Sequence, residues 1–434
     1  MLSLDGVARR PNFFMPTTAT LANAFFAPLH LALQASSSSR SCPSLSDQDW
    51  LSIGTLRVLQ DHPSGRAFLL HLASSNSLKP IASSLFFAGL ASRRRGLLCA
   101  EVNTHLCSIL ARQLPDELAD CPSLAGFDIY AGDGHYHAAA CHDITDAKSQ
   151  NRRAVGHFFT LNLRSHALSY LTGADAVGRK REHDMRALKR MDKETLRHDA
   201  PKGRNVIYVW DKAGIDFRAW YNWKQSAGIY FISREKDNMK LTVNAVRPWD
   251  TSSSMNAGVQ ADELAGSSNG VQLRRVTYQD AMQGTTYTFI TNEMTLEPGV
   301  IAHLYKMRWD IEKVFDELKN KLQERKAWAS SAVAKAMQAQ FLCITHNLLM
   351  LYEQQVEQEH GITNEAEQSR RAKRLEEVKS SLQNRGLSLP ALQQSIQRFT
   401  QRSVKFIRWI RCYLFFTGCY QQALSHLRRV YATL

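Results

Sequence analysis

Four polar side chains in the second half of the chain have the residue types and the spacing of a site that binds phosphate. They are Tyr305, Arg308, Glu312 and Lys319, in the stretch YKMRWDIEKVFDELK. An α-helix turns by about 100° per residue, so with Tyr305 at 0° the other three fall at about 300°, 340° and 320°. The four side chains therefore share one narrow stripe. A carboxylate flanked by Arg and Lys suits a site that holds a metal ion and grips a phosphate.

The apolar residues of the same stretch define the face that this stripe borders. They fall between about 180° and 280° and are Leu304, Met307, Ile311, Val314, Phe315, Leu318 and Leu322. The solvent face is predicted to hold Lys306, Asp310, Lys313 and Glu317. Asp316 and Glu317 are alternatives to Glu312, and Glu317 is predicted to point to solvent. Charge pairs of an ordinary amphipathic helix are the other interpretation of the whole pattern.

The spacing of the four polar residues resembles the YREK signature of bacterial insertion-sequence transposases of the family-four type. The resemblance covers roughly residues 50–350 and is strongest at 285–325. It implies an RNase H-like domain in which Glu312 is the third catalytic carboxylate of a DDE site. It implies that Tyr305, Arg308 and Lys319 contact phosphates at the transposon end. It also implies two Asp residues upstream, each at the end of a strand.

Asp133 and Asp211 are the two acids in such positions. Asp133 ends the run FDIYAGD, and Asp211 ends NVIYVWD, an apolar run typical of a buried central strand. Either acid could be only a turn residue, since Asp133 precedes Gly134 and Asp216 is an alternative to Asp211. The resemblance implies that Asp133, Asp211 and Glu312 are catalytic and bind Mg²⁺ or Mn²⁺, as two ions. Such ions prefer carboxylate and phosphate oxygens.

Histidines crowd the segment after Asp133, which reads GHYHAAACHD. His135, His137, Cys141 and His142 have the side chains of normal zinc ligands, and two His on one strand face could bind a metal. No second Cys/His pair completes the set, so a His facing DNA or a plain loop residue is the favoured interpretation. His135 also stands where members of the resembled family often have Thr or Ser.

The order of the predicted elements is that of an RNase H-like α/β fold, with a mixed sheet and helices on both faces. Strands are predicted in FDIYAGD, VGHFFTLNLRS, HALSYLT, NVIYVWD and GIYFIS, and helices in KREHDMRALKRMDKETLR and FRAWYNWKQS. A β-rich insertion at about 236–298, with a Ser/Gly-rich loop near 251–270, interrupts the fold. The N- and C-terminal regions are predicted to be helical.

The chain is expected to divide into four regions. These are a weakly structured segment and linker at 1–48, a helical DNA-binding region at 49–120, the catalytic domain at 121–330 and a helical region at 331–434. Arg93, Arg94 and Arg95 are predicted DNA contacts in the second region, although such a run can also be a solvated helix face. Trp249, in the insertion, is predicted to stack on a base turned out of the duplex, or else to pack under a hairpin.

Composition is consistent with a nucleic-acid partner. The chain has 434 residues, with 54 Lys and Arg against 40 Asp and Glu, and this net charge of +14 favours polyanionic partners. The eight cysteines form no CxxC pair, so neither a zinc ribbon nor a disulfide framework is indicated. No apolar run reaches the roughly 18 residues of a membrane span, and the N-terminus is a poor signal peptide. We expect a cytoplasmic, nucleoid-associated bacterial protein with no membrane partner and no small-molecule substrate.

These features predict a transposase that binds the terminal inverted repeats of an insertion sequence and catalyses metal-dependent DNA cleavage and strand transfer into target DNA. A homodimer on DNA is expected, because both ends must be handled together. The helix SVKFIRWIRCYLFF offers a candidate dimer surface, unless it packs on its own chain. The alternatives are a transposase-derived DNA-binding repressor that no longer cuts, and a hydrolytic RNase H-like nuclease.

Overall fold

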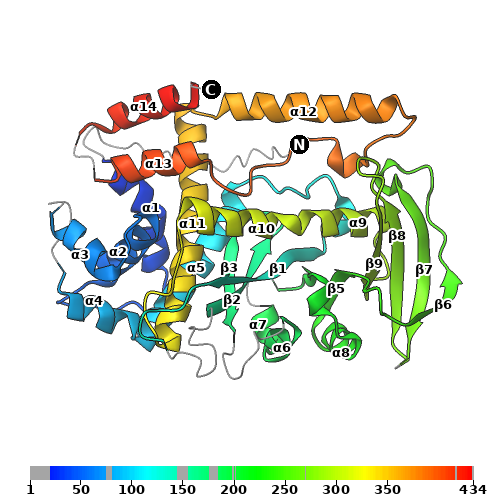
Figure 1. Cartoon of the computed structure of the whole chain (residues 1–434), viewed down its shortest axis with the longest axis horizontal. Helices are drawn as coiled ribbons and strands as arrows, with labels where there is room; N and C mark the ends of the chain where they lie inside the picture. Colours follow the sequence, from blue (N-terminus) through cyan, green and yellow to red (C-terminus); the bar gives the residue numbers. More distant parts are fainter. Residues whose placement is uncertain are drawn as a thin grey trace, which may run out of the picture.

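A nine-stranded mixed sheet forms the centre of the fold (Figure 1). The computed structural model describes residues 20–74, 81–143, 155–174, 184–197, 200, 202–268, 270–415 and 418–432. The strands, in the spatial order β3-β2-β1-β4-β5-β9-β8-β7-β6, are β1 (Phe127–His137), β2 (Val155–Asn162), β3 (Leu168–Gly173), β4 (Asn205–Val209), β5 (Ile229–Arg234), β6 (Leu241–Val246), β7 (Val259–Ser267), β8 (Gln272–Gln279) and β9 (Thr286–Thr291). β1, β4 and β5 are parallel neighbours, and the other pairs are antiparallel. The predicted RNase H-like mixed α/β fold is confirmed.

Helices flank the sheet and make up both terminal regions. The N-terminal set is α1 (Leu21–Gln34), α2 (Asp47–Leu59), α3 (Gly65–Ser74), α4 (Ser83–Leu90) and α5 (Arg93–Gln113). Those along the sheet are α6 (Asp184–Lys189), α7 (Lys193–Leu196), α8 (Phe217–Ala227), α9 (Pro298–Met307) and α10 (Trp309–Asp316). The C-terminal set is α11 (Ala332–His360), α12 (Glu365–Gln383), α13 (Val404–Tyr413) and α14 (Tyr420–Ala432). In the part of the chain that the structure describes, no helix is long and apolar enough to span a bilayer.

Apolar side chains that alternate along the strands form two separate layers, one on each face of the sheet. Ile129 and Ala131 of β1 and Ile207 and Val209 of β4 join the core that contains α10 and α11. Their sequence neighbours, among them Tyr130, Val206 and Tyr208, join a second core with residues of α6, α7 and α8. Because successive strand residues point to opposite faces, Asp133 and Asp211 continue the series of odd-numbered residues toward the α10 face.

Three elements differ from the sequence predictions. β1 does not stop at Asp133 but continues to His137, because β2 pairs with it along this extension, where Asp133 lies opposite Phe159. The predicted Ser/Gly-rich loop contains β7, held between β6 and β8. Residues 21–34, which we placed in a weakly structured segment, form α1, whose apolar side chains are buried against the rest of the core.

The 29-residue helix α11 connects the terminal regions to the sheet. Ser331 caps its start by accepting a hydrogen bond from the N–H of Ala334, and Gly361 ends it in the left-handed conformation, at φ 58°. Midway along α11, Asn347 donates to Asn103 of α5 at 2.9 Å and accepts from the backbone N–H of Leu168 on β3 at 2.9 Å. The helices of region 49–120 therefore share one core with the sheet and with α11.

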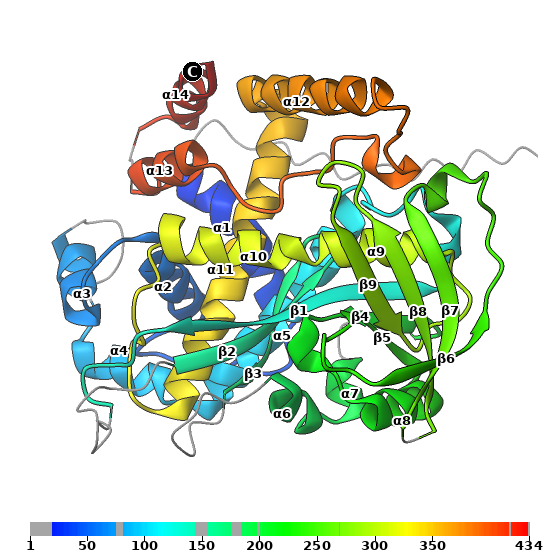
Figure 2. The ribbon, with the colours of Figure 1, turned by 45° about the vertical axis from the view of Figure 1, so that its right-hand side comes forward.

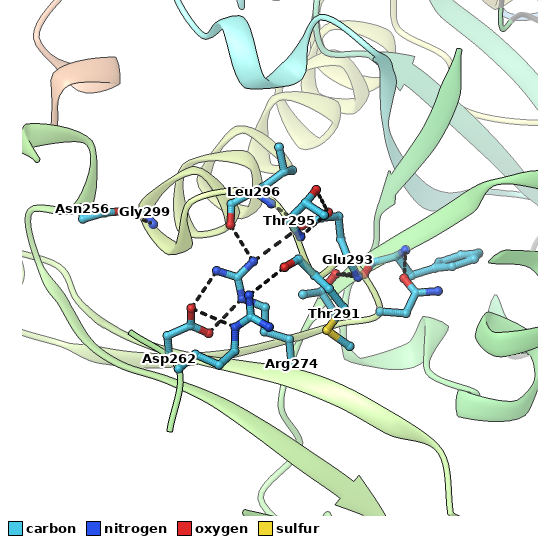
Figure 3. Close-up of polar contacts among 12 residues, drawn as sticks. Asn256, Asp262, Arg274, Thr291, Glu293, Thr295, Leu296 and Gly299 are labelled. Atoms are coloured by element: carbon cyan, nitrogen blue, oxygen red, sulfur yellow. Dashed lines mark hydrogen bonds and ion pairs between the residues drawn. The ribbon is translucent and has the colours of Figure 1, made fainter. Parts of the chain in front are cut away.

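The insertion extends the sheet and anchors the start of α9. β9 pairs with β5, and α9 packs against β7 and β8 (Figure 2). Figure 3 shows the buried polar contacts at this junction, where Arg274 makes two 2.8 Å hydrogen bonds to Asp262 and one of 2.6 Å to the carbonyl of Leu296. Glu293 accepts hydrogen bonds from Thr295 and from the backbone N–H of Leu296. These contacts fix the segment that leads into α9 at Pro298.

The predicted solvent face of the α9–α10 stretch is only partly exposed. Lys306 is exposed, but Asp310 is 5% exposed and Glu317 is fully buried. Glu317 lies 2.7 Å from Nδ1 of His346 on α11 and accepts a hydrogen bond from the backbone N–H of Arg402. The prediction was wrong for these two acids because segments distant in sequence cover them. α11 and the segment before α13 contact Glu317, and His166 of the β2–β3 turn lies beside Asp310.

We expect Glu317→Gln to lower stability by about 2 kcal/mol at pH 7, because it removes a buried carboxylate that contacts His346 and accepts from the backbone of Arg402. Burial alone raises the pKa of Glu317, but His346 and Arg402 outweigh burial and hold this pKa below 4.5. A carboxylate with a depressed folded-state pKa stabilises the fold above its unfolded-state pKa, and this contribution is lost as pH falls below about 4.5. Urea-unfolding midpoints should therefore differ between wild type and variant at pH 5–7 and converge below pH 4.5.

Glu376→Gln is the matched control, because Glu376 is exposed and its ion pair among the described residues is with Lys379 on the same helix. It should change stability by less than about 0.5 kcal/mol. Equal midpoints for wild type and Glu317→Gln at pH 7 would contradict a stabilising role for this buried pair.

Candidate active site

Strand register brings Asp133 and Asp211 to adjacent positions. β1 and β4 pair in parallel, and their last pair is Ala131 with Val209. Two residues further along each chain segment, the same register places Asp133 opposite Asp211. β4 ends at Val209, and two residues later Asp211 caps a short 3₁₀ turn by accepting a 2.7 Å hydrogen bond from the N–H of Ala213. The strand predicted in NVIYVWD is present but ends two residues before Asp211, and both acids lie on the α10 face.

Arg308 joins Asp133 to Glu312. Its Nη1 lies 3.6 Å from Oδ2 of Asp133, and its Nη2 donates a 2.9 Å hydrogen bond to Oε1 of Glu312. One guanidinium therefore reaches the carboxylates of both residues, which come from β1 and from the helix that crosses it (Figure 1). Burial alone lowers the pKa of Arg308, but Tyr305, Asp133 and Glu312 together hold this pKa above its ordinary value.

Tyr305 lies within electrostatic range of both Arg308 and Asp211. The Arg308 guanidinium lies 5.6 Å from the centre of the Tyr305 ring. Burial raises the pKa of the Tyr305 hydroxyl, Arg308 opposes the rise, and the negative charge of Asp211 adds to it. Tyr305 therefore stays protonated at neutral pH and is able to donate a hydrogen bond. The structure brings Asp133, Asp211, Tyr305, Arg308 and Glu312 to one end of the parallel strands.

Lys319 lies beyond the regular α-helix from which the direction of its side chain was predicted. α9 and α10 run end to end with an irregular step at Arg308, whose N–H is shared between the carbonyls of Leu304 and Tyr305 at 3.2 Å each. The chain then forms a π-helical turn from Glu317 to Lys321, which ends the 100° spacing. The Lys319 side chain is exposed on this turn, and its direction toward the carboxylates stays a prediction.

The three arginines predicted to contact DNA are not equivalent. Arg94 forms two 2.7 Å hydrogen bonds to Asp47. Arg95 is buried, lies 4.8 Å from the centre of the Trp50 ring and donates to the carbonyl of Leu45. These two side chains hold α5 against α2 and its preceding loop, a role that the sequence did not suggest, and their DNA contacts stay predictions. Arg93 is exposed and stays a candidate DNA contact.

The candidate dimer surface is already covered within the chain. Phe406, Ile407, Trp409 and Ile410 of α13 are at most 2% exposed. The Trp409 ring stacks on Tyr352 of α11, and its indole N–H donates to the carbonyl of Ala423 on α14. α13 therefore packs on its own chain, and of its large apolar side chains only Val404 is substantially exposed. Trp249 is half-buried in the loop after β6, and neither interpretation of it is tested.

A basic cleft beside the carboxylates was not predicted from the sequence. It has a volume of about 870 Å³ and lies between the β8–β9 loop, α9–α10 and α12. Its six basic lining residues are Arg234, Lys306, Arg308, Lys313, Arg371 and Arg374, against three acidic ones, Asp280, Asp310 and Glu367. Trp309, 57% exposed, also lines it. Because α12 is separated from α9 by some sixty residues, no local sequence pattern reveals this cleft.

Comparison with known proteins identifies the family. Residues 132–348, half of the 434-residue chain, match the family described as "Transposase DDE domain". The chain therefore belongs to the transposase DDE domain family, and the matched span contains both Asp residues and the α9–α10 stretch.

A relative is known from Sinorhizobium fredii (strain NBRC 101917 / NGR234), where it is named "Putative transposase y4zB". The two sequences are 30% identical over 166 residues, which cover 36% of this chain and 46% of that protein. The alignment thus spans about half the length of the relative.

Proposed function

We propose that this chain is a DDE transposase of the YREK, family-four type that binds the terminal inverted repeats of an insertion sequence and catalyses cleavage and strand transfer. The observation that carries the proposal is the convergence of Asp133, Asp211 and Glu312 around Arg308 and Tyr305, within the span that matches the family. In the proposed reaction a water first cuts one strand and frees a 3′ hydroxyl. That hydroxyl then attacks a phosphodiester of the target DNA, with no covalent enzyme intermediate.

The three acids fit a divalent-metal site by their chemistry. They offer carboxylate oxygens, and the side chains of Asp133 and Glu312 are 21% and 31% exposed, so an ion reaches them from solvent. Asp133, Asp211 and Glu312 would hold Mg²⁺ or Mn²⁺, as two ions. Bound there, the ions would help to activate the attacking oxygen and to stabilise the leaving oxygen.

The neighbouring side chains would position the DNA. The Arg308 guanidinium, held by Asp133 and Glu312, has further N–H donors for a phosphate oxygen. The protonated Tyr305 hydroxyl offers another donor. The basic cleft would take the DNA backbone, and the exposed Trp309 ring at its edge would contact sugar or base. Lys319, Arg93 and Trp249 are proposed as further contacts, the last to a base turned out of the duplex.

Substituting the acids tests the catalytic assignment. Asp133→Asn, Asp211→Asn and Glu312→Gln should each lower cleavage of terminal-repeat DNA at least about 1000-fold, because a ligand to the catalytic ions is lost. Binding to the repeat should stay within about threefold of wild type. Asp216→Asn is the matched control, because Asp216 caps α8 and is the neighbouring acid that the sequence left as an alternative.

The products decide between the candidate functions. Strand-transfer products from the wild-type chain support a transposase, whereas cleavage without transfer indicates a nuclease. Repeat binding without cleavage by the wild-type chain indicates a repressor. A fully active Glu312→Gln protein would overturn the assignment of this residue.

Salt dependence of binding tests the proposed phosphate contacts of Lys319 and Arg93. Each Ala substitution should remove about one phosphate contact and flatten the slope of log K against log salt by roughly 0.9. Lys193→Ala is the control, because Lys193 is exposed on α7, which packs on the other face of the sheet. A slope equal to that of wild type for Lys319→Ala, together with unchanged cleavage, would remove Lys319 from the site.

We propose that the working form is a homodimer assembled on DNA, with target DNA as a third component. One site of this kind serves one DNA end at a time, and excision requires both ends. Since the apolar face of α13 is covered, the dimer contacts lie elsewhere or form only on DNA. Light scattering should give one chain without DNA and two chains with two repeat ends. Excision by complexes of one chain on one end would exclude the dimer.

A further inference from the structure

A second cluster of metal-ligand side chains lies beside the carboxylates. His135 Nε2 is 2.9 Å from Oε2 of Glu324, and His137 Nδ1 is 3.3 Å from Oε1 of the same carboxylate. The ligand atoms of the three residues all lie within 4.8 Å of one another, and all three side chains are buried. The sequence suggested His135, His137, Cys141 and His142 as possible zinc ligands. In the structure Cys141 and His142 are exposed, and Glu324 takes their place beside the two buried histidines.

Backbone pairing builds this cluster from three segments. Asp133, His135 and His137 alternate along β1, so all three face α10. His157 of β2 lies directly opposite His135, on the same face. After the π-helical turn, the chain pairs with Ala138 in a short parallel β-bridge. The backbone of Ala138 forms hydrogen bonds with residues 325 and 327. This pairing places Glu324 next to the histidines.

The polar atoms of this cluster are incompletely satisfied among the described residues. Neither ring nitrogen of His137 or His157 makes a hydrogen bond there, although the ring of His157 stacks on His137 with centroids 5.3 Å apart. A buried polar group without a partner destabilises the fold, so a ligand that pairs with these nitrogens would be favourable.

The spacing of the ligand atoms suits a small tetrahedral ion. Zinc binds His nitrogen and carboxylate oxygen at about 2.0–2.2 Å, so two such ligands of a tetrahedral site lie roughly 3.3–3.5 Å apart. The two contacts between His nitrogens and Glu324, at 2.9 and 3.3 Å, are close to this separation. Gln338 donates to Glu324 at 3.2 Å and so orients the carboxylate from outside, as the partners of metal ligands do.

We propose that His135, His137 and Glu324 form a structural zinc site, with its fourth position toward His157. This site is distinct from the proposed catalytic carboxylates, whose all-oxygen donor set suits a harder ion. Zinc would cross-link β1, which carries Asp133, to the segment that follows Glu312 and Lys319. It would thereby hold the ends of the carboxylate-bearing elements together, independently of DNA.

Metal content of the full-length chain tests the proposal. After purification, loading with Zn²⁺ and dialysis, the wild-type chain should retain one zinc per chain. His137→Gln and Glu324→Gln should lower zinc affinity at least about 100-fold, because each removes a ligand, which costs more than losing an outer partner. His303→Gln is the matched control, because His303 is also buried, in α9, and its Nδ1 has no hydrogen-bond partner in the part of the chain that the structure describes. His303→Gln and Asp211→Asn should both keep one zinc.

A second measurement needs no substitution and so does not depend on the variants folding. X-ray absorption at the zinc edge of the wild-type chain should show nitrogen and oxygen neighbours, with the outer-shell scattering of two or three imidazoles and no sulfur. A sulfur neighbour would overturn the site in favour of one that uses a cysteine. A wild-type chain that retains no zinc would overturn it as well, and so would a zinc content unchanged in His137→Gln.

Discussion

The mutual repulsion of carboxylates is the constraint on which this structure depends. Two neighbouring strands and one helix deliver Asp133, Asp211 and Glu312 to the same end of the sheet, where like charges would drive these elements apart. Arg308 supplies the compensating charge between two of them, and its own helix carries Glu312. The position of α9–α10 over β1 is therefore an electrostatic requirement as well as a packing one. Both ends of this stretch are accordingly fixed by buried polar contacts.

The contacts at its two ends come from parts of the chain far apart in sequence. At the start, Arg274 of the insertion binds Asp262 and the carbonyl of Leu296, just before α9 begins. At the end, Glu317 is held by His346 of α11 and by the backbone of Arg402. The insertion and the C-terminal region thus contact the α9–α10 stretch at its opposite ends. The insertion also continues the sheet rather than forming a separate body.

The sequence predicts what depends on local periodicity. The strand that ends before Asp211, the β2–β3 pair and the amphipathic α9–α10 stretch all follow from alternation or helical spacing. The burial of Glu317 and Arg95 does not, because each is covered by a segment distant in sequence. Glu324 is 189 positions from His135, so spacing carried no sign of their contact. The strand β7 was hidden by its Ser- and Gly-containing sequence, which strand pairing on both sides overrides.

The place of α11 in the core has a consequence for how the protein is made. The N-terminal helices, complete at Gln113, bury their apolar faces largely against α11, which ends at His360. A ribosome adds about 5–20 residues per second, so the 247 residues between these points take roughly 12–50 s to synthesise. During that interval the apolar faces of α1, α2 and α5 lack their main partner. The nascent chain would thus offer chaperones a long window for binding, and its yield in a cell would depend on translation speed as much as on final stability.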